Sequence, residues 1–268
     1  MIVAAAICPS PPLLASELTG QADILPELRA ASAAAVTRLL AAVPDVVAVV
    51  GPAETTGPWD PAGELSLASF APALRRHSSQ SDNSKARNAA PSAAGLSAAG
   101  PPSTAPLTAA PSAAGAPPAA PFLPLALGIG ARLLDQAGYT GPRTFHGIGE
   151  DQPAVACLAM GRELASSAPR VALLAVGDGS ARRSAAAPGY LDERAAPFDE
   201  AVERAVRDGD LPAIAALDPH LATDLLAAGR PAWQTLAGAL SAAARLRTEV
   251  LYSDAPLGVA YLVATFIP

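Results

Sequence analysis

The sequence predicts an α/β protein with a central, mixed or mostly parallel sheet and helices on both faces. Three continuous apolar runs, at residues 2–7, 46–50 and 171–176, are typical of strands that are buried on both sides. Segments with helical spacing of their apolar residues separate these runs. A strand, a helix and a strand at this spacing form a βαβ unit, which favours a parallel sheet. We therefore expect a single domain over residues 1–268.

The first half of the chain supplies the first βαβ unit. The strand at 2–7 runs into a loop in which Pro9, Pro11 and Pro12 exclude a helix or a central strand. Residues 25–43 then place apolar side chains at helical spacing, and Pro44 ends that helix. The strand at 46–50 opens into a loop that begins at Gly51.

Residues 78–121 consist almost entirely of alanine, proline, serine and glycine. Such a segment lacks the large apolar side chains whose burial would offset the entropy lost on ordering. We expect a disordered insertion that acts as a spacer within the domain, with a binding tail as the alternative.

The second half alternates helices and strands. Gly128 and Gly130 lie inside a helical pattern and lack the further glycines of a phosphate loop, so we interpret them as helix glycines. Trp233 is expected to anchor its helix in the core. The expected helices cover 123–137, 153–166, 198–207, 211–217, 221–228 and 233–246, and the expected strands cover 145–149, 171–176, 248–253 and 258–266.

Composition excludes several classes of protein. The net charge of -6 and the pI near 5.0 argue against nucleic-acid binding, which usually requires a basic patch. No apolar stretch reaches the ~18 residues of a membrane-spanning helix. The first ten residues carry no basic segment, so they indicate a strand rather than a signal peptide, and a cytoplasmic protein is expected. Two cysteines form neither a disulfide framework nor a cysteine-based metal cluster.

The strongest candidate site follows the strand at 171–176. That strand breaks at Gly177-Asp178-Gly179-Ser180, and Arg182 and Arg183 come directly afterwards. In an open α/β sheet, ligands bind beyond the carboxyl ends of the strands. The two arginines could clamp a phosphate or carboxylate, or could form a solvated rim, and the sequence leaves both interpretations open.

Four loops, in this order, resemble those of the class III extradiol ring-cleavage dioxygenases (the LigB-like family), and most closely their short actinobacterial members. The loops are Cys8-Pro-Ser10-Pro-Pro-Leu-Leu, Gly51-Pro-Ala53-Glu54, Gly177-Asp-Gly-Ser180-Ala181-Arg182 and Tyr252-Ser-Asp254-Ala-Pro-Leu-Gly-Val-Ala-Tyr261. The stretch APGYLDERAAPFDEAV at 187–202 also resembles the family. The similarity covers both ends of the chain and leaves out only the insertion.

The resemblance implies an Fe(II) site formed by two histidines and a carboxylate, with a further histidine as the base. In this chain the two ligand histidines fall on Ser10 and Ala53, the acid falls on Asp254, and the base falls on Ala181. Serine and alanine supply no imidazole, and the three histidines present, at 77, 146 and 220, do not rebuild the set. We therefore expect the family fold without Fe(II), other cofactors or ring cleavage.

Three functional hypotheses remain open at this point. The first is a non-catalytic relative that binds a small aromatic or anionic ligand or a partner protein, and homo-oligomers are also open. The alternative to this hypothesis is that the loops persist only because the fold needs their turns. The second is altered chemistry, such as carboxylate acid–base catalysis or a Ser-His-Asp arrangement of Ser180 with His146. The third is an active non-haem Fe(II) dioxygenase or another oxidoreductase with substitute ligands. The candidate pocket residues are Ser10, Glu54, His146, Asp178, Ser180, Tyr252 and Asp254.

Overall fold

A computed structural model describes residues 1–15, 24–65 and 122–268, and the expected insertion at 78–121 lies outside the described residues. Within the described residues, a seven-stranded sheet has the order β3-β6-β2-β7-β1-β9-β8. Its strands are β1 (Ile2–Cys8), β2 (Val46–Pro52), β3 (Gly57–Trp59), β6 (Arg143–Ile148), β7 (Val171–Val176), β8 (Arg247–Asp254) and β9 (Tyr261–Ile267). A separate two-stranded sheet consists of β4 (Glu64–Leu65) and β5 (Phe122–Leu123), which pair in parallel.

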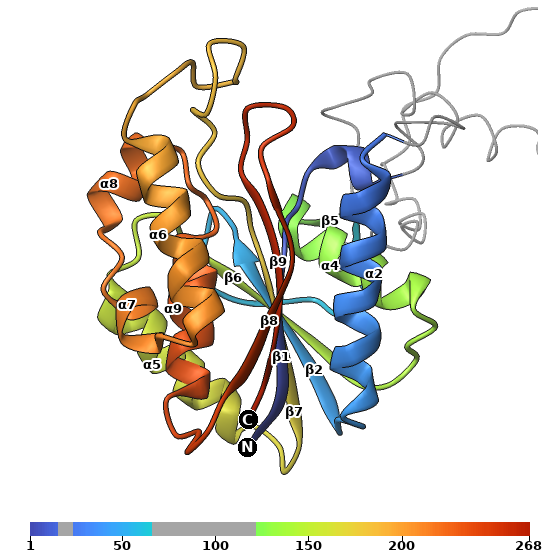
Figure 1. The fold of residues 1–268 in the computed structure, drawn as a ribbon. Helices are drawn as coiled ribbons and strands as arrows, with labels where there is room; N and C mark the ends of the chain where they lie inside the picture. Colours follow the sequence, from blue (N-terminus) through green and yellow to red (C-terminus); the bar gives the residue numbers. More distant parts are fainter. Residues whose placement is uncertain (16–23, 66–121) are drawn as a thin grey trace, which may run out of the picture. The chain divides into compact units, whose positions relative to one another are not determined.

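The centre of the large sheet is parallel, as the buried apolar runs predict. Strands β6, β2, β7 and β1 pair in parallel, while β9 runs antiparallel to both β1 and β8. Strand β8 consequently runs in the same direction as β1. The carboxyl ends of β6, β2, β7, β1 and β8 therefore meet at one edge, which we call the carboxyl edge and which lies at the top of Figure 1.

Helices cover both faces of this sheet, as predicted (Figure 1). One face carries α2 (Pro26–Ala41) and α4 (Leu125–Gln136), and the other carries α5 (Ala154–Ser166), α6 (Ala195–Asp208), α7 (Leu211–Ala215), α8 (Pro219–Asp224) and α9 (Arg230–Leu240). A short 3-10 turn, η1 (Pro12–Leu14), follows β1. The α/β class of the fold is thus confirmed.

The core explains the continuous apolar runs. All six residues of β7 are buried, with Leu173 packed on the α9 face and Leu174 packed on the α2 face. A strand that is covered on both faces needs apolar side chains at every position, so it shows no alternation with polar residues. Cys157 and Trp233 are buried in the α9-face core, and Trp233 does anchor its helix there.

Two predicted helices differ most from their bounds in the structure. The helix expected at 221–228 is α8, which begins earlier because Asp218 caps it by accepting a hydrogen bond from the backbone N–H of His220. The helix expected at 233–246 is α9, which begins at Arg230, with Pro231 in its first turn, and ends at Leu240. Trp59 lies in the short strand β3.

Helix α9 is buried along its whole length and packs closely against α5. Glycines make this approach feasible on both helices. A Cβ added at Gly161 of α5 would lie 2.0 Å from the carbonyl oxygen of Thr235, and one added at Gly238 of α9 would lie 2.3 Å from the carbonyl oxygen of Leu158. Only hydrogen at these positions allows the two backbones to touch.

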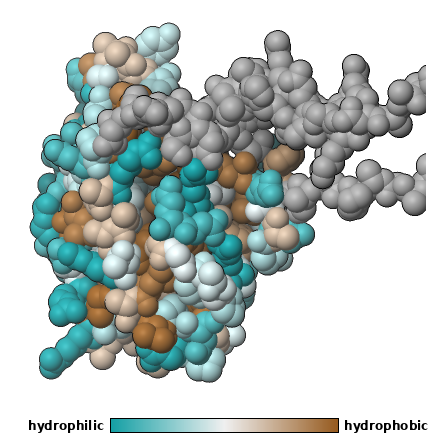
Figure 2. Space-filling view, turned by 90° about the vertical axis from the view of Figure 1, so that its right-hand side faces the viewer, coloured by the Kyte–Doolittle hydropathy of each residue, from teal (hydrophilic) through white to brown (hydrophobic). Residues whose placement is uncertain are grey.

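The outer surface of the described residues mixes polar and apolar side chains. Figure 2 shows hydrophilic and hydrophobic residues interspersed over the side that faces right in Figure 1. Among the described residues, no helix has both the length and the apolar character that crossing a membrane would require.

We predict that Gly161→Ala destabilises the protein, although alanine is normally the better helix former by about 1 kcal/mol. The added methyl group collides with the backbone of α9, so the free energy of unfolding should fall by roughly 1–3 kcal/mol. Urea denaturation measures this. Val155→Ala on the same helix is the matched control, because Val155 is 70% exposed. An unchanged or raised unfolding midpoint for Gly161→Ala would contradict the packing described here.

Candidate functional site

The candidate site lies where the connections of the sheet diverge. The loop after β1 leads to α2 on one face, whereas the loop after β7 leads to α6 on the opposite face. Strands β1 and β7 are neighbours, so a crevice of the kind that binds ligands in open α/β sheets is expected between these loops. Across it, the backbone N–H of Ser10 donates to Asp178 Oδ1 at 2.7 Å, and that of Gly177 donates to the carbonyl of Cys8 at 3.0 Å.

The loop 177–181 is held by the elements around it. The carbonyl of Asp178 accepts from the N–H of Gly229 at the start of α9, at 2.8 Å. Gly179 donates to the carbonyl of Ala260 at 2.8 Å, and Ala260 donates in turn to the carbonyl of Ser180 at 2.8 Å. A Cβ on Gly177 would lie 2.5 Å from the Cα of Gly229, so glycine is required there. The loop is thus a rigid platform rather than a flexible flap.

A buried polar cluster lies behind this loop. Ser180 is fully buried; its Oγ donates to Asp199 Oδ2 at 2.5 Å and its N–H donates to Asp199 Oδ1 at 2.9 Å. Arg183 Nη1 pairs with Asp199 Oδ2 at 3.2 Å. Burial raises the pKa of Asp199, and the hydrogen bonds from Ser180 and Arg183 oppose that rise. The Ser180 hydroxyl therefore serves to bind α6 to the loop.

Asp178 has the most perturbed carboxyl group at the carboxyl edge. Burial raises its pKa from 3.8 to about 6, and hydrogen bonds from Ser10 oppose the rise. Tyr261 lies close enough for the charge of Asp178 to matter: burial raises the pKa of the Tyr261 hydroxyl, and the negative charges of Asp178 and then Tyr252 raise it further. Asp178 is therefore the group in this site best suited to gain or lose a proton near neutral pH.

A pocket of about 230 Å³ opens beside this cluster, between α6 and the β8–β9 hairpin, and we call it the Asp199 pocket. The hydroxyl of Ser253 on β8 donates to Glu203 Oε2 on α6 at 2.7 Å and so ties its two walls together. The charged and aromatic residues among those lining it include Arg183, Asp199, Glu200, Glu203, Trp233 and Asp254.

Several predicted site residues lie far from this pocket. His146 is on β6, where its Nε2 contacts the hydroxyl of Thr144 at 3.1 Å, and burial lowers the pKa of its imidazole. Strands β6 and β8 are five positions apart in the sheet, which separates His146 from Asp254 by about 24 Å at ~4.8 Å per strand. The hypothetical pairing of Ser180 with His146 is not formed, because Ser180 donates to Asp199 instead.

The positions that the resemblance assigns to metal ligands are also dispersed. Ala53 follows β2, where its N–H is held by the carbonyl of Ile148 at 3.0 Å, and Asp254 is the last residue of β8. Four strand positions, about 19 Å, separate these two elements, whereas two ligands of one ion are held by bonds of roughly 2 Å each. The assignment of Asp254 as the acid of a triad with Ala53 therefore stays a prediction, and four strand positions lie between their elements.

The donor set does not fit Fe(II). Ser10 is buried and offers a hydroxyl, Ala53 and Ala181 offer no side-chain donor, and Glu54 is exposed beyond β2. Across residues 1–15, 24–65 and 122–268, no group of three or more histidine, cysteine, aspartate or glutamate side chains is arranged to hold a metal ion.

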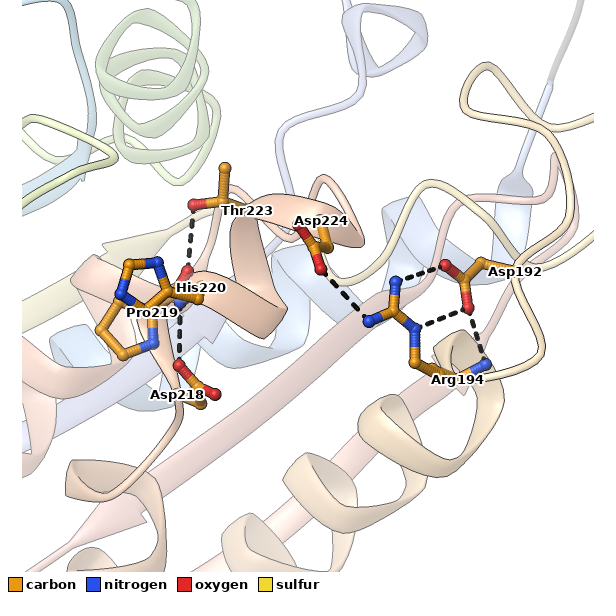
Figure 3. Close-up of polar contacts among 7 residues, drawn as sticks. All are labelled: Asp192, Arg194, Asp218, Pro219, His220, Thr223 and Asp224. Atoms are coloured by element: carbon orange, nitrogen blue, oxygen red, sulfur yellow. Dashed lines mark hydrogen bonds and ion pairs between the residues drawn. The ribbon is translucent and has the colours of Figure 1, made fainter.

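The remaining histidines do not change this conclusion. His220 lies on α8, where its backbone N–H donates to the Asp218 carboxylate (Figure 3). Its backbone N–H thereby takes part in the capping of α8. Nearby, Arg194 forms ion pairs with both Asp192 and Asp224. His77 lies outside the described residues.

The two arginines after the loop are both engaged within the protein. Arg182 Nη1 donates to the carbonyl of Gly189 at 2.6 Å, and Arg183 pairs with Asp199. The clamp for an anionic ligand that these two residues could have formed is therefore already occupied by groups of the chain itself.

Sequence reasoning missed three residues of this site: Asp199, Trp233 and Tyr261. Asp199 is 19 positions from Ser180, and no local pattern joins them. Trp233 was expected only as a core residue, although it also lines the Asp199 pocket. The sole signal for Tyr261 was its place at the end of the fourth loop of the resemblance.

Comparison with known proteins supports the fold alone. No family model matches the chain, and no curated protein matches its sequence. Among solved structures, the crystal structure of the uncharacterized protein JW3007 from Escherichia coli K12 is similar, with a TM-score of 0.53 and 16% sequence identity. The similarity covers 99% of this chain and 100% of that one.

We predict that Asp178→Asn removes a pH dependence of stability. The raised pKa means that folding favours the protonated carboxyl, so the free energy of unfolding of the natural protein should fall as the pH rises from about 4 to about 6, by on the order of 2 kcal/mol. Asparagine keeps the oxygen that accepts from Ser10 and loses the charge. The variant should therefore match the natural protein near pH 4 and exceed it near pH 7 in urea denaturation.

The control for this comparison is Asp135→Asn, which removes a carboxylate that is paired with Arg143 at the surface. Its stability profile should keep the decline between about pH 4 and pH 6. If Asp178→Asn also kept the decline, Asp178 would not be the group that titrates.

Proposed function

We propose that this chain is a non-catalytic relative of the class III extradiol dioxygenases that has lost the Fe(II) site and retained a small-molecule site at the carboxyl edge. One observation carries the proposal. Two of the loops that resemble the family, those after β1 and β7, meet where these strands diverge, with Ser10 bonded to Asp178, yet the histidine positions hold Ser10, Ala53 and Ala181. Loops that keep their arrangement but lack the imidazole donors are suited to binding a small molecule rather than to reacting with oxygen.

The Asp199 pocket is the small-molecule site of this proposal. It adjoins the loop 177–181, which has a fixed backbone, and two of its walls are held together by the bond from Ser253 to Glu203. A preformed concave site of this kind binds ligands without the entropic cost of ordering a loop. A role of these loops in the fold alone would explain the Ser180–Asp199 bond but would not require an open pocket beside it.

The alternative of an active enzyme with substitute ligands has less support. It would use Asp254, Glu54 and His146, which belong to β8, to the loop after β2 and to β6. These elements lie up to five strand positions apart, and no hydrogen bond or ion pair joins the three residues within the described parts of the chain.

We predict that the protein does not retain iron after anaerobic reconstitution with Fe(II). Elemental analysis of the desalted protein should give well below one equivalent of iron, and oxygen uptake with a panel of catechols should equal the rate without protein. The variants Asp254→Ala and His146→Ala should change neither measurement. Stoichiometric iron together with uptake that depends on catechol would overturn the proposal and favour the substitute-ligand enzyme.

A further inference from the structure

Strand β8 forms an exposed edge of the large sheet. It is eight residues long, pairs with β9 on one side, and has no backbone partner on its other side within the described residues. In Figure 1 it lies at the front, between α6 and α2, and neither helix crosses it. An edge strand of this length presents a row of unpaired N–H and C=O groups to which another strand can pair.

The opposite edge of the sheet is protected against such pairing. It consists of β3, which has three residues, and the central one is Pro58, which has no N–H to donate. A short edge strand and a proline are two of the devices by which proteins prevent edge-to-edge association. Strand β8 has neither of them, so the two edges of the sheet differ in their capacity to bind another strand.

Charges of opposite sign lie at the two ends of β8. Arg245 and Arg247 lie at its amino end, whereas Asp254 is its last residue and Glu200 of α6 lies beside that end. All four residues are exposed, and none has an ion-pair partner within the described residues. An antiparallel strand of the same sequence brings its acidic end to the basic end of this one. A parallel strand would place like charges opposite each other, which is destabilising.

A β-bulge decides which side chains of β8 share a face. The register with β9 shifts between Val250 and Tyr252, so β8 contains one residue more than its partner there. Before the shift, Glu249 forms an ion pair with an arginine of α2. After the shift, Tyr252 packs on the α2 face, while the hydroxyl of Ser253 bonds to α6 on the other face.

Arg247 and Asp254 consequently lie on the same face, although an odd number of positions separates them. Alternation along the strand places Arg247 with Glu249 and Asp254 with Tyr252. Arg247 also lines a groove with residues of α2, and burial and then the charge of Asp254 raise the pKa of the Tyr252 hydroxyl. A twofold axis normal to the sheet leaves the faces unchanged, so Arg247 of one copy can lie opposite Asp254 of another.

We propose that the protein forms a twofold dimer in which β8 pairs antiparallel with β8 of a second copy, with Arg247 opposite Asp254 of the other copy. The same register places Thr248 opposite Ser253, and it places the two bulges at the centre. The twofold axis repeats each contact, so the Arg247–Asp254 ion pair forms twice. A foreign strand would meet the backbone groups but not this order of charges, so a second copy of the chain is the partner that the edge fits.

The dimer goes beyond the proposed function and does not depend on it. It concerns the homo-oligomer that the sequence leaves open, and it is formed by an edge of the sheet rather than by the loops that resemble the dioxygenases. Iron content and oxygen uptake therefore test the proposed function, whereas the mass in solution tests the dimer.

Sedimentation velocity of the full-length protein measures this association. A species of twice the chain mass of 26.7 kDa should grow with protein concentration and decline in about 1 M salt, because salt screens exposed charges. Arg247→Asp and Asp254→Arg should each weaken the dimer roughly tenfold, and both changes in one chain should restore it, because the ion pair is then reversed. Arg162→Asp is the matched control, since Arg162 is exposed on α5, and it should leave the dissociation constant unchanged.

A pair of introduced cysteines tests the register itself. Arg247→Cys and Asp254→Cys in one chain should give a disulfide-linked dimer under mild oxidation. The two positions are roughly 20 Å apart along one strand, which excludes a bond within the chain. Neither single variant should form the linked dimer, because its new thiol lies opposite a residue that is not cysteine. The natural cysteines, Cys8 and Cys157, are buried.

Three results would overturn the inference. The first is a monomer at every concentration up to the millimolar range. The second is a dimer whose dissociation constant is the same for the natural protein, Arg247→Asp and Asp254→Arg, because its interface then lies elsewhere. The third is a linked dimer from either single cysteine variant but none from the pair, because the strands then meet in another register.

Discussion

The burial of α9 is the constraint on which the rest of this structure depends. Every residue of that helix, from Arg230 to Leu240, is buried, including an arginine, a glutamine and a threonine. A helix can be buried so completely only if its polar side chains find partners inside the protein. Arg230 donates to the backbone carbonyls of Gln152 and Glu150, while Gln234 donates to those of Ala215 and Leu217.

These bonds place three connections around one helix. The loop before α5 is held at Arg230, the loop between α7 and α8 is held at Gln234, and the platform loop is held at the first turn, where Gly229 donates to Asp178. The close contact of Gly161 with α9 sets the depth of the helix over the sheet. Trp233 is thereby brought to the Asp199 pocket, so the position of the pocket follows from the packing of a core helix.

The chemistry of the carboxyl edge follows from what the loops contain and from what surrounds them. Asp178 and Asp199 are both surrounded by protein, and burial raises the pKa of each carboxyl. Ser180 and Arg183 stabilise the charge of Asp199, whereas Ser10 is the hydrogen-bonding partner of Asp178. The two carboxyl groups thus differ in role. Asp199 holds α6 to the loop 177–181, and Asp178 remains able to gain or lose a proton.

The sequence by itself determined the α/β class and the parallel centre of the sheet, and it predicted the edge at which we place the candidate site. Continuous apolar runs such as Val171–Val176 are visible in sequence, because a strand that is buried on both faces tolerates no polar residue. The absence of imidazole at Ser10, Ala53 and Ala181 was equally visible, because it is a matter of residue identity and needs no geometry.

Only the tertiary structure decided which of the candidate residues meet. The strand order places His146 and Asp254 five strand positions apart, and no periodicity in the sequence encodes that order. It also brings Asp199 to Ser180 and turns Trp233 from a core anchor into the wall of a pocket. Contacts of this kind depend on how whole elements cross and pack, whereas sequence patterns report the burial of each element separately.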